Sequence, residues 1–215
     1  MNDDATIVAG RGYIYFAPPN TPKPSQILDP LNPGPEWATI GHTSRDDLPE
    51  FGRDGDDPEA IGSWQNAKLR QTTPDITYSV TINAIQASAD VYRLYFGAGP
   101  ELVQPDGSVR IPATPVPQIQ ALLVILVDGT RFVPLWHPRV SLLGSDSIEM
   151  ATDDFVVFPI TGTFLSSSLI GGAVGEWAQA LPVQPSKLGM PRPLPPEMEF
   201  GFKAQLFEAG EGEGE

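Results

Sequence analysis

The sequence predicts an all-β protein, a β-sandwich or barrel-like arrangement of about eight strands with one short flanking α-helix. The 215 residues include 24 Pro and 21 Gly, and this density of turn-forming residues leaves little room for long helices. The apolar segments are short and rich in β-branched and aromatic residues. Polar and apolar residues also alternate along several of these segments, as they do in a strand with one buried face.

Two strands separated by a loop are expected in the N-terminal part of the chain. The first strand covers residues 6–16, where Ile14 and Phe16 alternate with two tyrosines. A proline-dense segment follows over residues 18–35, and it is expected to be a loop because proline cannot donate a ladder hydrogen bond. A short strand is then expected over residues 37–42.

The next segment, residues 44–59, is acidic and has almost no apolar content, so a long exposed loop is expected there. Further strands are expected over residues 61–70 and 76–85. Alternate residues of the second strand fall on two faces, with Ile76, Tyr78, Val80 and Ile82 on one and Thr77, Ser79, Thr81 and Asn83 on the other. This strict period of two predicts one buried face and one wetter face.

One segment has the pattern of a short amphipathic helix. An N-cap, an acidic first turn, apolar residues at helical spacing and a glycine stop follow one another as Ser88, Asp90, Val91, Leu94, Tyr95 and Gly97. The apolar stripe of such a helix needs a sheet to cover.

The most apolar segment covers residues 121–127 and ends at Asp128-Gly129, a strong hairpin turn signal, so a partner strand is expected from Arg131. Seven consecutive apolar residues predict a strand that is buried on both faces, between a second sheet on one side and the helix on the other. Further strands are expected over residues 139–143 and 155–165, separated by a polar loop.

Two parts of the chain are expected to differ in kind. Residues 1–181 are predicted to form the β domain, with a long loop over residues 43–60, and residues 182–215 a Pro- and Gly-rich acidic arm. The arm alone cannot bury enough apolar surface to offset its ordering entropy, so a neighbouring subunit is the partner expected to order it. Its apolar anchors are expected to be Phe200, Phe202, Leu206 and Phe207.

Residue types that catalysis or metal binding needs are scarce. The chain has no cysteine, which excludes a disulfide framework, a thiolate metal site and a cysteine nucleophile. Neither of its two histidines, His42 and His137, lies in a catalytic or metal-binding motif. The carboxylates of residues 54–59 lack EF-hand spacing, so a solvated loop or a contact with a basic patch on another copy is expected. No catalytic, cofactor-binding or metal-binding residue is predicted.

The charge balance restricts the partners of the chain. With 27 Asp and Glu against 13 Lys and Arg the formal net charge is −14, which argues against tight binding to nucleic-acid phosphates. It suits a surface that a polyanion passes without being held, although many soluble proteins are acidic merely to stay dispersed. No apolar run approaches the roughly 20 residues that span a bilayer, and the acidic start is unlike a signal peptide. A soluble product made in the cytoplasm, without a membrane anchor, is expected.

Two short motifs resemble those of a known family. Residues 37–44 read Trp-Ala-Thr-Ile-Gly-His-Thr-Ser, and residues 62–70 read Gly-Ser-Trp-Gln-Asn-Ala-Lys-Leu-Arg, with an acidic stretch between them. This order resembles major tail (tail-tube) proteins of long-tailed siphophages that infect actinobacteria, and the resemblance covers about residues 5–172. The residues that carry it are Trp37, Gly41, His42, Thr43, Ser44, Trp64, Gln65 and Asn66.

The resemblance implies a structural virion protein with a tail-tube fold and extended N- and C-terminal arms. Six copies would close into a ring, and rings would stack into the tube through which genomic DNA passes without sequence-specific binding. The partners implied are the chain itself, a tape-measure protein, a tail terminator and distal tail proteins. An inter-ring loop would lie at Arg45, Asp46, Asp47, Glu50, Phe51, Arg53, Asp54, Asp56 and Asp57, with Phe51 as a buried anchor.

Two alternatives to a tube subunit stay open at this point. A tail terminator or head–tail joining protein of the same build would form one ring and stop, whereas the long loop and the C-terminal arm suit open-ended stacking. A carbohydrate-binding β-sandwich would expose a cluster of aromatic residues. Trp37 and Trp64 instead lie beside expected strands and are interpreted as core or interface residues.

Overall fold

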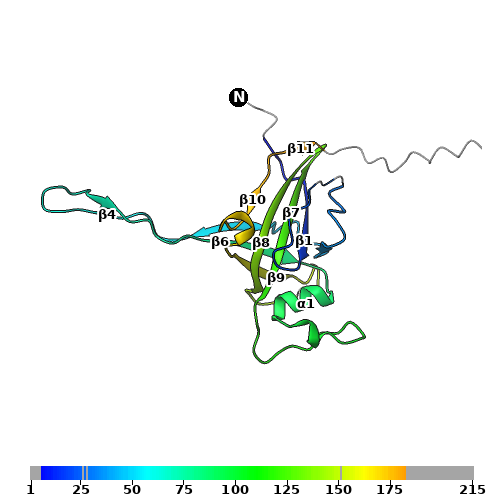
Figure 1. Cartoon of the computed structure of the whole chain (residues 1–215). Helices are drawn as coiled ribbons and strands as arrows, with labels where there is room; N and C mark the ends of the chain where they lie inside the picture. The colour runs from blue at the N-terminus through cyan, green and yellow to red at the C-terminus, as the bar shows by residue number, and fades with distance from the viewer. Residues whose placement is uncertain (1–5, 26, 28, 151, 183–215) are drawn as a thin grey trace, which may run out of the picture. The chain divides into compact units, whose positions relative to one another are not determined.

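Antiparallel strand pairing in the computed structural model runs through one nine-stranded sheet (Figure 1). The structure describes residues 6–25, 27, 29–150 and 152–182. The strands of the described chain are β1 (Arg11–Ala17), β2 (Ala38–Thr39), β3 (Glu50–Asp54), β4 (Ala60–Ile61), β5 (Arg70–Gln71), β6 (Thr77–Ala84), β7 (Gln118–Asp128), β8 (Arg131–Gly144), β9 (Phe158–Phe164), β10 (Glu176–Trp177) and β11 (Leu181–Pro182). Strands β4 and β5 pair with each other outside the nine-stranded sheet. Helix α1 (Ala89–Phe96) and the 3-10 turns Pro100–Leu102 and Ser168–Ile170 complete the described elements. The predicted all-β class with one short helix is confirmed.

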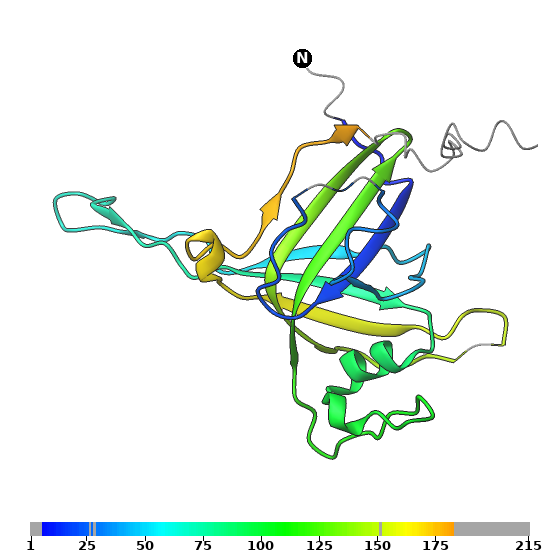
Figure 2. The ribbon, with the colours of Figure 1, turned by 45° about the vertical axis from the view of Figure 1, so that its right-hand side comes forward.

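The sheet curls into a barrel-like form. Its order is β2-β1-β7-β8-β9-β6-β3, and the short strands β10 and β11 also pair with β8. The chain between its two edges, residues 38–54, pairs with β1 at its start and with β6 at its end. A bridge between Thr43 and Ala84 adds to the pairing with β6. Figure 2 shows β1, β7 and the first half of β8 crossing β6 and β9 at a steep angle, as in orthogonally packed sheets.

The core lies inside this curled sheet. Its buried side chains come from β1, β6, β7, β8, β9, α1 and the segment after β2: Ile14, Phe16, Ile40, Val80, Ile82, Ala84, Val91, Leu94, Leu122, Val124, Leu135, Val140, Leu142, Phe158, Ile160 and Phe164. The inward residues of β6 are Val80, Ile82 and Ala84, which confirms the predicted alternation along that strand. Tyr78 on the same face is 39% exposed, because it lies where β6 leaves the core.

Strand β7 is buried on both faces, as the sequence predicts. The elements that pack on these two faces are not the expected second sheet and helix. Leu122 and Val124 face the barrel interior, whereas Leu123 and Ile125 belong to a second cluster on the outer face. The outer cluster is covered by the proline-dense loop and not by a second sheet, because Trp37 and the short segment before it fold back over β1 and β7. The Tyr15 hydroxyl donates to the Pro30 carbonyl at 2.8 Å and ties this loop down.

Strand β8 is one element of 14 residues, so the two separate strands expected after Arg131 are wrong in that respect. Gln120 faces Val140 while Leu122 faces His137, which places one extra residue on β8 in a bulge that contains Pro138. A bulge leaves the extra residue unpaired, and a proline is tolerated there. The inward residues of β8 are odd-numbered before the bulge and even-numbered after it, so the apolar pattern stays on one face.

Helix α1 forms as predicted. The Ser88 side chain accepts a hydrogen bond from the Val91 N–H, and Gly97 ends the helix in the left-handed conformation with φ 60°. Val91 and Leu94 are buried in the core. The helix packs against β8 and β9 at one end of the barrel (Figure 2). The helix therefore closes one end of the barrel.

Replacing this N-cap tests the local argument. Ser88→Ala is expected to lower the free energy of unfolding by about 1 kcal/mol and the melting temperature by about 2–4 °C, because the Val91 N–H loses its acceptor. Ser88→Asp keeps an acceptor and should melt like the parent protein. Equal melting temperatures for all three proteins in a calorimetric scan would contradict the capping role.

Two sequence expectations between residues 44 and 70 are corrected by the structure. The exposed loop over residues 44–59 contains β3, which pairs with β6 from Glu50 to Asp54 because Phe51 supplies an apolar side chain that packs on the core. The strand expected over residues 61–70 is instead the end of a hairpin, in which β4 pairs with β5 around a turn. The expected C-terminal arm, with Phe200, Phe202, Leu206 and Phe207, lies outside the described residues apart from its first residue.

Candidate functional site

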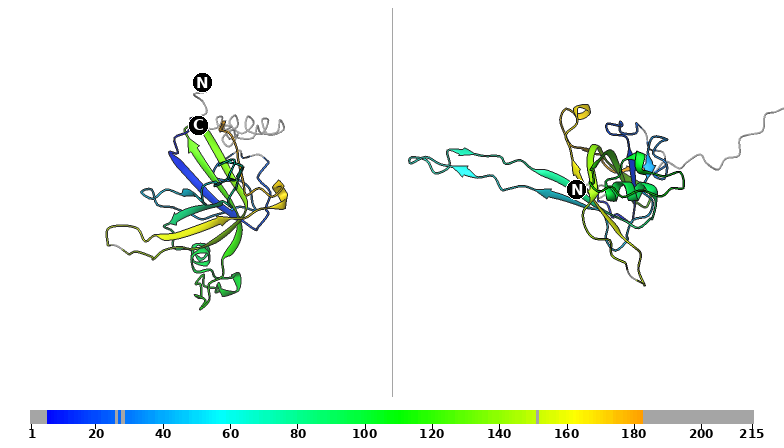
Figure 3. Two further views of the ribbon diagram at one scale, coloured as in Figure 1. Left: turned by 90° about the vertical axis from the view of Figure 1, so that its left-hand side faces the viewer. Right: turned by 90° about the horizontal axis from the view of Figure 1, so that it is seen from below.

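A long hairpin projects from the barrel at the level of β3 and β6 (Figures 1 and 3). Every residue from 53 to 73 is exposed. Backbone hydrogen bonds nevertheless order its far end: the Leu69 N–H donates to the Ile61 carbonyl at 3.0 Å, and the Asn66 and Ser63 N–H groups each donate to the other residue's carbonyl at 3.2 and 2.7 Å. The hairpin is thus a defined turn held away from the core that positions it.

The tip of this hairpin, residues 60–71, exposes large apolar side chains. Trp64 is fully exposed at 102%, and Ile61 and Leu69 are 53% and 65% exposed. Exposed apolar residues gathered on a projecting element are typical of an interaction site, and tryptophan is enriched among the residues that contribute most to binding. The resemblance motif Trp64, Gln65 and Asn66 therefore lies at the tip, away from any core.

Apart from Arg53 at its base, the charges of the hairpin are segregated between its two strands. The outgoing strand carries Asp54, Asp56, Asp57 and Glu59, and the returning strand carries Lys68 and Arg70. Among the described residues, none of these six side chains takes part in an ion pair. Exposed charges of this kind steer and orient contacts between molecules, and salt screens them.

The first motif, residues 37–44, has a structural part in this arrangement. Trp37 is buried in the outer cluster, whereas His42 is exposed. Gly41 has φ 89°, and a Cβ there would lie 2.0 Å from the Gln86 side-chain oxygen, so only glycine fits without movement. Ser44 accepts from the Asp47 N–H at 3.1 Å. These residues turn the chain from β2 to β6 and so set the position of β3.

The other residues predicted for an inter-ring loop divide between two places. Arg45, Asp46 and Asp47 lie in an exposed turn before β3, and Glu50, Arg53 and Asp54 lie on β3 itself. Asp56 and Asp57 follow on the outgoing strand of the hairpin. Within the described residues, no three His, Asp or Glu side chains come together in a group that could hold a metal ion.

Phe51 lies at the base of the hairpin and packs within its own chain. Its ring centroid is 5.1 Å from that of Trp177, 6.1 Å from Phe164 and 6.2 Å from His137. The aromatic cluster of these four residues joins β3 to β8, β9 and β10. The sequence does not indicate this aromatic cluster, because its four residues are far apart along the chain and share no motif.

His137 is the polar centre of the aromatic cluster. It is 3% exposed and stacks on Phe164 with ring centroids 3.7 Å apart. Trp177 Nε1 donates to His137 Nε2 at 3.1 Å, which leaves Nδ1 to carry the proton and donate to the Val174 carbonyl at 3.0 Å. Burial lowers the pKa of His137 to about 4, and the hydrogen bond to Val174 opposes this only in part.

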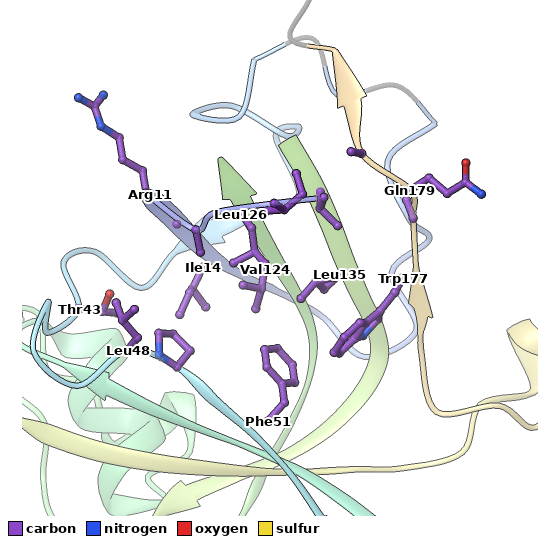
Figure 4. Close-up of a pocket in the computed structure, with 18 residues that line it drawn as sticks. Arg11, Ile14, Thr43, Leu48, Phe51, Val124, Leu126, Leu135, Trp177 and Gln179 are labelled. Carbon is purple, nitrogen blue, oxygen red and sulfur yellow. The ribbon is translucent and has the colours of Figure 1, made fainter. Parts of the chain in front are cut away.

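An apolar pocket opens beside the aromatic cluster (Figure 4). The ends of β1, β7 and β8 that line it lie at the end of the barrel away from α1 (Figure 2). Its volume is about 780 Å³. The inward side chains of β1, β7 and β8 form its wall, with Phe51 and Trp177 on the other side: Ile14, Val124, Leu126, Leu135, Phe51 and Trp177. The segments before β3 and between β10 and β11 complete the lining, with Thr43, Leu48, Pro49, Ala178, Gln179 and Ala180.

The barrel carries a hairpin with an exposed apolar tip and an apolar pocket near the base of that hairpin. Exposed apolar surfaces of this kind are typical of proteins that contact other subunits. The chain matches the phage tail tube protein family over residues 1–178, and it belongs to this family. The major tail protein Gp23 of Mycobacterium phage D29 and that of Mycobacterium phage L5 are each 33% identical to it over 174 residues. Each alignment covers 76% of this chain and 86% of the relative.

The family assignment confirms the resemblance found in the sequence. The protein is a structural tail tube protein of a phage, and the virion tail is its place of action. None of the helices in the described part of the chain is long and apolar enough to cross a membrane. The family is one of tube subunits, so the alternative of a terminator or head–tail joining protein is not favoured.

Proposed function

We propose that six copies of this protein close into a ring and that rings stack, through the hairpin, into the tube that conducts the viral genome. The observation that supports stacking is the hairpin itself, whose residues 53–73 are exposed along their whole length and end in Ile61, Trp64 and Leu69. An isolated subunit gains nothing from holding this apolar tip in water.

The inter-ring contact extends from the tip along the exposed charges. Arg45, Asp46 and Asp47 before β3, and the acidic outgoing strand of the hairpin, supply polar contacts at the rim. Phe51 acts at the base of the hairpin, where its packing against the aromatic cluster fixes the direction in which the hairpin leaves the barrel. In this proposal residues 1–181 form the ring and residues 182–215 add contacts between copies.

The proposed tube acts by geometry and charge, without catalysis or a cofactor. The formal net charge of −14 disfavours lasting contacts with DNA phosphates, so the genome passes without sequence-specific binding. A tube of this kind also needs partners that set its length and close its ends. A tape-measure protein, a tail terminator and distal tail proteins are the partners proposed for these roles.

The experiment that tests this function is negative-stain electron microscopy of the purified protein over a concentration series. Hollow tubes of uniform width are expected above a threshold concentration, because head-to-tail contacts between identical copies do not close. Rings that never stack would instead indicate a terminator or joining protein, and monomers at every concentration, also with purified tail tips as initiators, would refute self-assembly.

A further inference from the structure

We propose that the pocket at the open end of the barrel receives the hairpin tip of a second copy, with Trp64 as the inserted side chain. This inference rests on the proposed function, since it names the surface on which an inter-ring hairpin docks. The donor is residues 60–71 of one copy. The acceptor is the pocket between β1, β7, β8 and Phe51 of the next copy.

The tip has the properties of an inserted element. Trp64, Ile61 and Leu69 are all more than half exposed, and Figure 3 shows the hairpin directed away from its own barrel. The hydrogen bonds between Ser63 and Asn66, and between Lys68 N–H and the Asn66 side-chain oxygen at 3.0 Å, order the turn before any contact is made. A preordered tip loses less conformational entropy when it docks.

The pocket has the properties of a receptor for such a tip. Leu126 and Val133, which point to the same side as the core residues Val124 and Leu135, are only partly buried in the isolated subunit. The volume of about 780 Å³ lies within the range of roughly 300–1,000 Å³ that is usual for ligand pockets. An indole ring with one or two aliphatic side chains is a ligand of this size and character.

One set of charges around the two surfaces is complementary, whereas Lys68 and Arg70 of the donor segment meet no acidic side chain among the described residues that line the pocket. Arg11 is the one charged side chain among the described residues that line the pocket, and Figure 4 shows it at the mouth, directed away from the apolar wall. The strand that leads to the guest tip carries Asp57 and Glu59, which an arginine at the mouth would meet. The apolar side chains then fill the pocket and the ionic contact lies at the rim.

The positions of tip and pocket also explain open-ended growth. The pocket lies near the base of the hairpin, since Phe51 lines it, and the tip lies ten residues further along, about 33 Å at the rise of an extended strand. A contact between tip and base is heterologous, so each added copy presents a new vacant pocket and the assembly does not close. The same arrangement prevents a hairpin from filling its own pocket.

Cross-linking tests the inference directly, because the chain contains no cysteine of its own. One variant carries Gln65→Cys at the tip, and a second carries Gly10→Cys at the pocket, where a Cβ has no neighbour closer than 3.8 Å. The two are mixed at tube-forming concentration and oxidised, so a mixed disulfide joins a tip to a pocket. The control mixture replaces Gly10→Cys by Ser108→Cys, an exposed site in the loop after α1.

A mixed disulfide at least about tenfold more abundant than in the control mixture is expected, because a docked tip has a high effective concentration at the pocket. Equal yields from the two mixtures, in samples that electron microscopy shows to contain tubes, would overturn the docking site and leave the proposed function intact. The absence of both tubes and the mixed disulfide would refute the docking site and the proposed function together.

A chain that ends at residue 182 tests whether residues 183–215, and not the hairpin tip, occupy the pocket. If residues 183–215 filled the pocket, the truncated chain would form the mixed disulfide and the full chain would not. That outcome would overturn the proposal. Equal yields from the full and truncated chains, both above the control, would support insertion of the tip.

Discussion

Replacing residues 60–71 by a two-glycine turn should abolish tube formation and leave the barrel folded. The replaced residues are exposed and contribute no side chain to either buried cluster, so the melting temperature is expected to stay within about 2 °C of the parent protein. Sedimentation and electron microscopy should find particles no larger than rings at concentrations where the parent forms tubes.

Single substitutions refine this prediction. Trp64→Ala should cost about 2–4 kcal/mol at each contact, which weakens association about 30-fold to about 1000-fold, whereas Trp64→Phe should retain part of the contact. The matched control is Phe155→Ala, which removes an exposed aromatic side chain away from both the tip and the pocket and should leave tube formation unchanged. Long tubes from the shortened hairpin would contradict its role. A deletion over residues 46–57 would be a poorer test, because it removes β3 from the sheet.

Acid should destabilise the isolated barrel through His137. The unfolded chain binds a proton at this residue below pH 6.5, but the folded protein binds it only below about pH 4, because burial lowers the pKa of the imidazole. The unfolded state therefore carries more protons between these values. The stabilisation is complete above pH 6.5 and is lost as the pH falls towards 4, with a total of about 3 kcal/mol.

Denaturant unfolding of the short-hairpin variant, diluted until sedimentation shows only monomers, measures this loss at pH 7 and pH 4. His137→Gln should show a pH dependence smaller by about 3 kcal/mol than its parent, because one titrating group is removed. Ser147→Ala, at an exposed position with no titrating group, is the control and should keep the dependence of the parent. Identical pH dependence in all three proteins would contradict the assignment.

Local signals in the sequence were sufficient where local chemistry decides the structure. The cap at Ser88, the stop at Gly97 and the hairpin turn after Asp128 are all found where the sequence predicts them. The apolar run before that turn also predicts burial on both faces. The sequence does not reveal which element covers the outer face, since Trp37 comes from a loop whose apolar content is low.

The segment between β2 and β6 shows why the rest could not be predicted. Phe51 is a single apolar residue among charges, and its pairing in β3 depends on distant partners on β6, β8 and β9. Residues 61–70 are predicted to be a strand, yet they form the end of a hairpin, because Ser63 and Asn66 hydrogen-bond across the turn. The pocket likewise is lined by residues from segments far apart in the sequence, which no local pattern brings together.

The pairing of β1 with β7 has a consequence for the newly made protein. Arg11 pairs with Val127, so the barrel cannot close until more than half of the chain has left the ribosome, at about 5–20 residues per second. The hairpin, whose contacts are local in sequence, can form several seconds earlier. A nascent chain therefore presents a tip before it possesses a pocket, and the order of synthesis delays polymerisation until the subunit is complete.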